Sequence, residues 1–199
     1  MKRKSTYRKN SVSVTIEGFF VIKQPHRKPL VTGANHLTNK GLNGIINLIG
    51  DSYADKQYNY VGTAWAYIIS FGDDTVTPTT ATMEYLASPV SYFPDAGADV
   101  IKTKEADGQY RCVWKSQWFA DHFSEDKVIG EVALHINAWR DTGDLTPPIQ
   151  AYTNYPILYF DAKIVSRVSV ADGDFSIYEV NHAKSLTIEY WMRLKMADT

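Results

Sequence analysis

Runs in which apolar and polar residues alternate with a period of two are the feature that most constrains this fold. In residues 11–22, Val12, Val14 and Ile16 fall on one face and polar side chains on the other, which is typical of a half-buried strand. Further extended segments are predicted at residues 60–71, 83–93, 100–105, 110–119, 128–139, 157–170, 175–180 and 185–194. About eight or nine strands divided by turn signals predict a mainly β chain, a single β-sandwich or jelly-roll-like domain.

Two details of the strands follow from local patterns. The dipeptide at 107–108 is Asp-Gly, a strong hairpin signal, so residues 100–105 and 110–119 are expected to pair. Residues 94–99 are predicted to form a turn. In the alternating run 128–139, Glu131 and His135 fall on the polar face, and we expect His135 to point outward into a cross-strand or subunit contact.

One segment changes from a period of two to a helical period. Leu42, Ile45, Ile46 and Ile49 lie at i, i+3, i+4 and i+7, which places them on one face of a helix. The sequence therefore predicts one short helix over about 38–50, with Thr38 or Asn39 as its N-cap.

Composition narrows the class of protein. The chain has 199 residues, of which 44 % are hydrophobic and 13 % aromatic, enough for one sizeable core. A net charge of −1 argues against a nucleic-acid-binding module as a whole, because such modules carry a basic excess. Cys112 is the single cysteine, so no disulfide forms within the chain, and we expect it to be a small buried hydrophobe.

The sequence shows no apolar run of membrane-spanning length and no signal-peptide pattern. We therefore expect synthesis in the cytoplasm and no membrane partner. We expect a basic N-terminal arm at 1–10 and a single β-rich domain at 11–199 that carries a long loop at 141–156.

The N-terminal arm has two interpretations. Its basic residues are Lys2, Arg3, Lys4, Arg8 and Lys9. A solvated terminus is one reading. Contact with an acidic neighbouring subunit or with packaged nucleic acid is the other.

Groups that suit catalysis are sparse. The densest titratable cluster holds Asp121, His122, Glu125 and Asp126, and acidic turns occur at 73–74 and 172–174. Such groups could carry acid–base or metal chemistry. They lie in loops and turns, however, which favours carboxylates that are simply solvated. The sequence contains no Gly-rich phosphate loop, no G-x-S-x-G and no H-E-x-x-H motif. We therefore expect no enzyme activity, no cofactor and no metal site.

The five tryptophans allow two interpretations: a sugar-stacking platform on a β-sandwich, or filling of the core and of subunit interfaces. The second is favoured. The proline-rich loop at 141–156 is long for a small domain, and long loops are often functional. It is therefore a candidate partner contact.

The chain is organised around residues 62–86. In this segment a strand passes into a polar arm, and the arm ends on Leu86. Proline and β-branched residues favour an extended arm. Several short motifs accompany it. In chain order these are Asn35–Gly41, Tyr67–Gly72, Thr75–Thr82, Leu86, Val128–Leu134, the single arginine Arg167 in an apolar strand, and Ser185–Tyr190.

This order of motifs, over about residues 35–194, resembles small structural proteins of tailed bacteriophage virions. The resemblance implies a non-enzymatic virion subunit that forms a symmetric oligomer at the tail, neck or capsid surface, with copies of itself and other virion proteins as partners. The alternative is a glycan-binding, receptor-recognition module of a phage fibre. Candidate subunit-contact residues are Lys2, Arg3, Lys4, Arg8, Lys9, Thr75, Pro78, Leu86, Pro147, Pro148, Tyr152 and Tyr155.

Overall fold

The structure is a computed structural model, and it describes residues 14–33, 35–39, 41–42, 67–90, 96–107, 109–120, 122–138 and 161–196. These residues form a mainly β structure of eleven strands in antiparallel pairs, as the sequence predicts. In the described part of the chain, no helix is both long and apolar enough to span a membrane.

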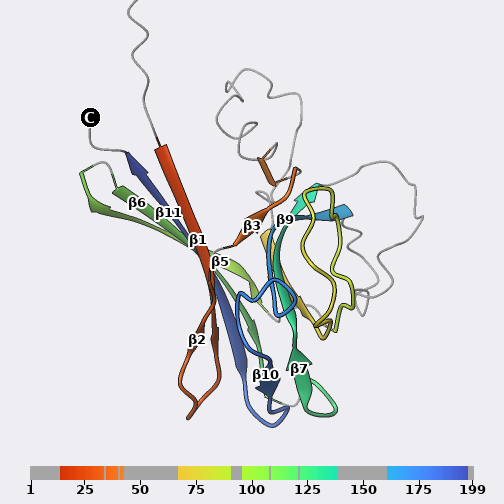
Figure 1. The fold of residues 1–199 in the computed structure, drawn as a ribbon. Coiled ribbons are helices and arrows are strands. Elements are labelled where there is room, and N and C mark those ends of the chain that lie inside the picture. Colours follow the sequence, from red (N-terminus) through yellow and green to blue (C-terminus); the bar gives the residue numbers. More distant parts are fainter. Residues whose placement is uncertain are drawn as a thin grey trace, which may run out of the picture.

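Two sheets make up the sandwich (Figure 1). The five-stranded sheet has the order β2-β1-β11-β6-β5 and contains β1 (Val14–Lys23), β2 (Leu30–Val31), β5 (Ala96–Ala106), β6 (Gln109–Trp118) and β11 (Leu186–Met196). The four-stranded sheet has the order β3-β9-β8-β4 and contains β3 (His36–Leu37), β4 (Tyr67–Gly72), β8 (Glu131–Ala138) and β9 (Asp161–Ser169). The strands β7 (Lys127–Ile129) and β10 (Tyr178–Val180) pair separately.

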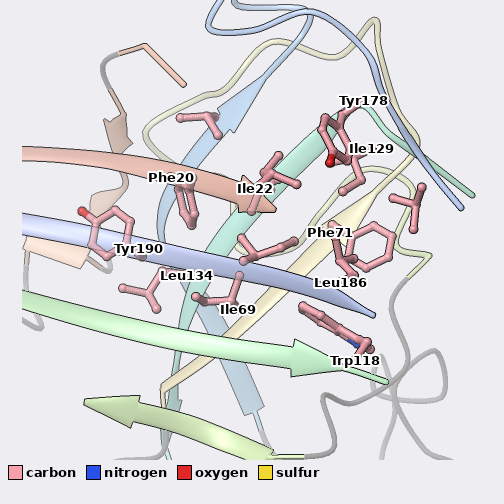
Figure 2. Packing of buried hydrophobic residues seen from close by; sticks show 14 of the residues in the cluster. Phe20, Ile22, Ile69, Phe71, Trp118, Ile129, Leu134, Tyr178, Leu186 and Tyr190 are labelled. Carbon is pink, nitrogen blue, oxygen red and sulfur yellow. The ribbon is translucent and has the colours of Figure 1, made fainter. Parts of the chain in front are cut away.

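The core lies between the two sheets, because alternate side chains of each strand point inward. Phe20 and Tyr190 come from the five-stranded sheet, while Phe71 and Leu134 come from the other, and all four are buried in one cluster. Figure 2 shows these labelled side chains filling the space between the crossing strands. Phe71 meets the ring of Trp118 edge-on, with centroids 5.4 Å apart. This contact joins the two sheets.

The strand predicted at residues 11–22 forms as β1, but the expected buried face is wrong at Ile16, which is 38 % exposed. Burial begins in the apolar run after Gly18, where Phe20, Val21 and Ile22 are all buried. The predicted hairpin also forms, since β5 and β6 pair with Ala106 opposite Gln109. Several segments differ from the prediction. The described residues 83–90 of the segment predicted at 83–93 form only an isolated bridge at Pro89, and residues 175–177 precede β10. Residues 96–99, predicted as a turn, belong to β5. The run 128–139, predicted as one strand, divides at Gly130 into β7 and β8.

The predicted helix begins where expected, although its residues 43–50 lie outside the described part of the chain. Thr38 caps the first turn, since its hydroxyl accepts a hydrogen bond from the Gly41 amide at 3.0 Å. The Leu42 amide donates to the Thr38 carbonyl at 2.9 Å. The Thr38 amide also donates to the carbonyl of Val165, at an irregularity in the β8–β9 register, so the helix start is fixed to β9.

His135 is not exposed to solvent, contrary to the prediction. It is 2 % exposed and Glu131 is fully buried. The hydroxyl of Ser70 on β4 lies within hydrogen-bond distance of the His135 imidazole, so the expected cross-strand contact is present. Glu131 and Ala133 of the same strand lie on the outer face of the four-stranded sheet, the face turned away from the five-stranded sheet, and residues 73–88 cover this face there.

Candidate functional site

Residues 73–88, called the arm loop below, leave the sheet and return to it at the same point. Gly72 forms an isolated antiparallel bridge with Pro89. The Asp73 amide donates to the Ser88 carbonyl at 3.0 Å, and the Val90 amide donates to the Phe71 carbonyl, also at 3.0 Å. The segment is therefore a closed Ω-loop, a type of loop whose two ends lie close together.

Two glycines allow the loop to cross β8 at close range. The Gly130 amide donates to the Gly72 carbonyl at 2.8 Å. A Cβ at Gly130 would lie 2.3 Å from the carbonyl oxygen of Asp74, and one at Gly72 would lie 2.3 Å from that of Ser88. Any larger residue at either position would push the loop away from the sheet.

Arg167 lies under the arm loop and is fully buried. Its Nη1 donates to the Thr79 hydroxyl at 2.7 Å, and its Nη2 donates to the Thr77 carbonyl at 3.0 Å. Its Nε and Nη2 both donate to Oε2 of Glu131, at 2.9 and 2.7 Å. The guanidinium therefore joins β9, β8 and the loop in one contact.

Glu131 holds the other end of the loop. Its Oε1 accepts a hydrogen bond from the Ser88 amide at 2.8 Å, and its Oε2 accepts one from the Ala87 amide at 3.2 Å. A buried carboxylate needs compensation of this kind, because an unpaired buried charge is costly. The Arg167–Glu131 pair thus has partners within the protein for both ions.

Two further carboxylates complete the group. Asp172 accepts hydrogen bonds from the Thr79 amide at 3.1 Å and from the Thr79 hydroxyl at 2.6 Å. Asp74 accepts one from the Thr77 amide at 2.8 Å. The Arg167 guanidinium lies 3.8 Å from Asp74 and 3.6 Å from Asp172. We call Arg167, Glu131, Asp74 and Asp172 the clasp.

The prediction of solvated turn carboxylates is therefore wrong for Asp74, Asp172 and Asp174, whose side chains are 12, 11 and 9 % exposed. Burial on its own would raise the pKa of Asp172. The hydrogen bonds from Thr79 and Ser169 outweigh it, and the pKa is lowered overall. Asp73 does fit the prediction, because it is exposed.

Leu86 anchors the loop end in a small apolar cluster of its own chain. It is 5 % exposed and packs with Ala133 and Ile164, which are fully buried, and with Met83. Next to it, the Ile164 amide donates to the Glu84 carbonyl at 3.0 Å. The sequence left open whether Leu86 sits in its own domain or in a neighbour, and the structure places it in its own.

The opposite side of the arm loop faces solvent. Between Thr75 and Met83 the sequence has no charged residue. Val76 is 78 % exposed, Pro78 is exposed and Thr75 is half-buried. We call this surface, residues 75–82, the ridge. It is uncharged and fixed from below by the clasp.

Of the residues predicted to contact other subunits, Thr75 and Pro78 lie on the ridge, while Leu86 lies beneath the loop. The N-terminal candidates and those of the loop at 141–156 lie outside the described residues. These are Lys2, Arg3, Lys4, Arg8, Lys9, Pro147, Pro148, Tyr152 and Tyr155. A subunit contact remains a prediction for all of them.

The titratable cluster at 121–126 does not converge among its described members. Glu125 pairs with Lys127 at 2.7 Å, and Asp126 pairs with the His182 imidazole at 2.6 Å. Each of these carboxylates is largely exposed. Asp121 lies outside the described residues. The Ser70–His135 pair has the elements of a nucleophile and a base, but both side chains are at most 2 % exposed.

The described tryptophans do not form a sugar-stacking platform. Trp114 and Trp118 are core residues, 4 and 0 % exposed. The indole of Trp191 stacks on Phe19 with ring centroids 5.7 Å apart, and the Arg111 guanidinium lies 4.6 Å from its ring centre. Trp65 and Trp139 lie outside the described part of the chain.

The sequence does not predict the clasp as a site, although each of its four members stands out separately in the sequence. Arg167 is the single arginine of its strand, and an arginine is almost never fully buried unless it is paired. That signal predicts a buried partner without identifying it. Glu131 and Asp172 lie 36 residues or fewer from Arg167 in sequence, but Thr79 is 88 residues away.

Comparison with protein-family models, with curated proteins and with solved structures finds no match to this chain.

Proposed function

We propose that this protein is a non-enzymatic structural subunit of a bacteriophage particle, which forms a symmetric oligomer at the tail, neck or capsid surface. The observation that carries the proposal is the convergence of the separate motifs behind the virion-protein resemblance. The strand ending in Gly72 and the Thr/Pro arm form the loop, Val128–Leu134 supplies Glu131, and the lone arginine is Arg167. Together they build a fixed surface loop.

A fixed loop suits assembly. Binding by a loop that is already ordered avoids the entropy cost of ordering it on contact. The clasp and Leu86 hold the arm loop from below, while its uncharged ridge is left for a partner. Absence of charge favours burial at the centre of an interface, where charged residues are depleted.

The first test is the oligomeric state. We expect light scattering coupled to size-exclusion chromatography to give a defined oligomer for the purified chain, or co-elution with a virion protein. Mass spectrometry of purified particles of a phage whose genome encodes this sequence should then detect the chain in many copies. A strict monomer at all concentrations, absent from purified particles, would overturn the proposal.

Matched substitutions test the role of the ridge. Val76→Asp places a charge on the ridge, and we expect it to dissociate the oligomer without lowering the melting temperature. Ile101→Asp is the control, because Ile101 is also exposed, at 55 %, but lies on β5 of the other sheet. An oligomer that survives Val76→Asp would exclude the ridge as the subunit contact, and particle mass spectrometry would still test the virion role.

The glycan-binding alternative has a separate readout. It requires the isolated chain to bind a defined sugar on a glycan array. Binding that is lost on substitution of Trp65 or Trp139, with particle association unaffected, would favour it over a purely structural subunit.

A further inference from the structure

We propose that His36, Asp172 and Asp174 form a binding site for a divalent transition-metal ion, next to the clasp. Each residue offers one ligand atom, and these atoms all lie within 4.8 Å of one another. His36 comes from β3, while both aspartates come from the turn that follows β9. The site does not depend on the oligomeric role proposed above.

The distances fit a metal better than a direct contact. The His36 Nε2 lies 3.5 Å from the Asp174 Oδ1. Two ligands about 2.1 Å from one zinc ion in tetrahedral geometry are about 3.4 Å apart. The other histidine–aspartate pair is different, since the Nδ1 of His182 and the Oδ1 of Asp126 are 2.6 Å apart, the distance of a direct hydrogen bond.

The turn holds both carboxylates in place. Gly173 has a φ of 78°, a backbone conformation that glycine adopts without cost. The Ser169 amide donates to the Asp174 Oδ2 at 3.0 Å, and the Ser169 hydroxyl donates to the Asp172 Oδ2 at 2.7 Å. Hydrogen bonds of this kind orient the ligands of metal sites, and the Asp174 Oδ1 is directed toward His36.

The local charge is a separate argument for a cation. The Asp174 and Asp172 side chains are only 9 and 11 % exposed, and the clasp adds the carboxylates of Asp74 and Glu131. Arg167 is the positive group within 4 Å of three of these four carboxylates. One guanidinium cannot balance four acidic groups, and a shielded excess of negative charge favours a bound cation.

The ligand types indicate which ion. One imidazole nitrogen with carboxylate oxygens suits Zn²⁺ or Mn²⁺ better than Ca²⁺ or Mg²⁺, which prefer oxygen ligands alone. His36 has a side chain that is 46 % exposed, so water can complete the coordination.

Isothermal titration of the untagged chain with Zn²⁺, and with Mn²⁺ followed by electron paramagnetic resonance, tests the site. We expect one equivalent to bind to the wild type and at least about a tenfold loss of affinity in His36→Ala and in Asp174→Asn. His182→Ala is the matched control and should bind as the wild type does. Circular dichroism of each variant checks that it is folded. Because the His36 side chain is 46 % exposed, we expect His36→Ala to fold as the wild type does.

Three results would overturn the assignment. These are no binding to the folded wild type, equal loss in His36→Ala and His182→Ala, and a preference for Ca²⁺ over Zn²⁺. Broadening of the Gly173 amide resonance by Mn²⁺ gives a second readout that needs no variant, and an unaffected resonance at saturating Mn²⁺ would place the ion elsewhere.

Discussion

The guanidinium of Arg167 donates two hydrogen bonds to one carboxylate oxygen of Glu131, and both side chains are fully buried beneath the arm loop. Removing one member of such a pair leaves the other as an uncompensated buried charge. We expect Arg167→Met or Glu131→Gln to lower the free energy of unfolding by about 3–5 kcal/mol, measured by urea denaturation.

The double variant with both Arg167→Met and Glu131→Gln measures how much of the lost stability comes from the interaction between the two side chains. Because the two side chains share hydrogen bonds, the double variant should lose less stability than the sum of the single losses. Lys104→Gln, which removes an exposed ion pair with Asp107, should leave the urea midpoint unchanged. Strict additivity of the two buried substitutions would show that Arg167 and Glu131 act independently.

Gly130→Ala tests the crossing of the arm loop over β8. The new methyl group would overlap the Asp74 carbonyl oxygen, since a Cβ there lies 2.3 Å from it. We expect a loss of about 1–3 kcal/mol and faster hydrogen exchange at the Thr77 and Thr79 amides. In Gly33→Ala the nearest atom would be 3.2 Å away, so that substitution should have the smaller effect.

Leu86 and Val76 lie on opposite sides of the same loop, so substitutions at the two positions should affect stability unequally. Leu86→Ala should cost about 2–5 kcal/mol, because it leaves a cavity in the cluster with Ala133 and Ile164. Val76→Ala should change the free energy of unfolding by less than about 0.5 kcal/mol. Thermal unfolding of the two variants measures both losses of stability. Equal losses would mean that Val76 is covered in the folded protein.

The clasp predicts how stability depends on pH. The pKa of Asp172 is lowered below its ordinary value of 3.8 in the folded protein, because the hydrogen bonds of Thr79 and Ser169 outweigh burial. Its ionised form therefore stabilises the fold above pH 3.8, and this contribution is lost as the pH falls through the lower, folded pKa.

Thr79→Val tests that contribution, because it removes the hydroxyl hydrogen bond to Asp172. It also removes the acceptor of the Arg167 Nη1, but the guanidinium stays charged from pH 7 to pH 3, so the loss that depends on pH is that of Asp172. Between pH 7 and pH 3, we expect the variant to lose less stability than the wild type, as measured by urea midpoints. Identical pH profiles would show that the Thr79 hydroxyl does not contribute to the lowered pKa of Asp172.

The fold could be predicted from the sequence because strand periodicity is a local property. The alternating run at 11–22 predicts the position of β1, and the local Asp-Gly signal predicts the pairing of β5 and β6. The clasp could not, because it depends on contacts between distant segments. The alternation in β8 places Glu131 and His135 on a polar face, and only the position of residues 73–88 shows that part of this face is covered.

The division of the predicted strand 128–139 at Gly130 also depends on a contact between distant segments. Its sequence neighbours Val128, Ile129, Glu131 and Val132 all suit a continuous strand, and nothing local predicts a break. The break is explained by the Gly130 amide, which bonds the Gly72 carbonyl from another strand. Arg167, the single arginine of its strand, was the available signal for a buried site, and it identified neither Glu131 nor Thr79.

The bridge between Gly72 and Pro89 makes the arm loop a replaceable insert. The chain leaves and rejoins the sheet at one place, so loops of other lengths can be grafted between these residues without moving β4. A graft is constrained by chemistry rather than by length, because it must bring its own acceptors to the Arg167 guanidinium and its own donors to Glu131. Chains with this fold can therefore differ in sequence along the ridge while keeping these contacts.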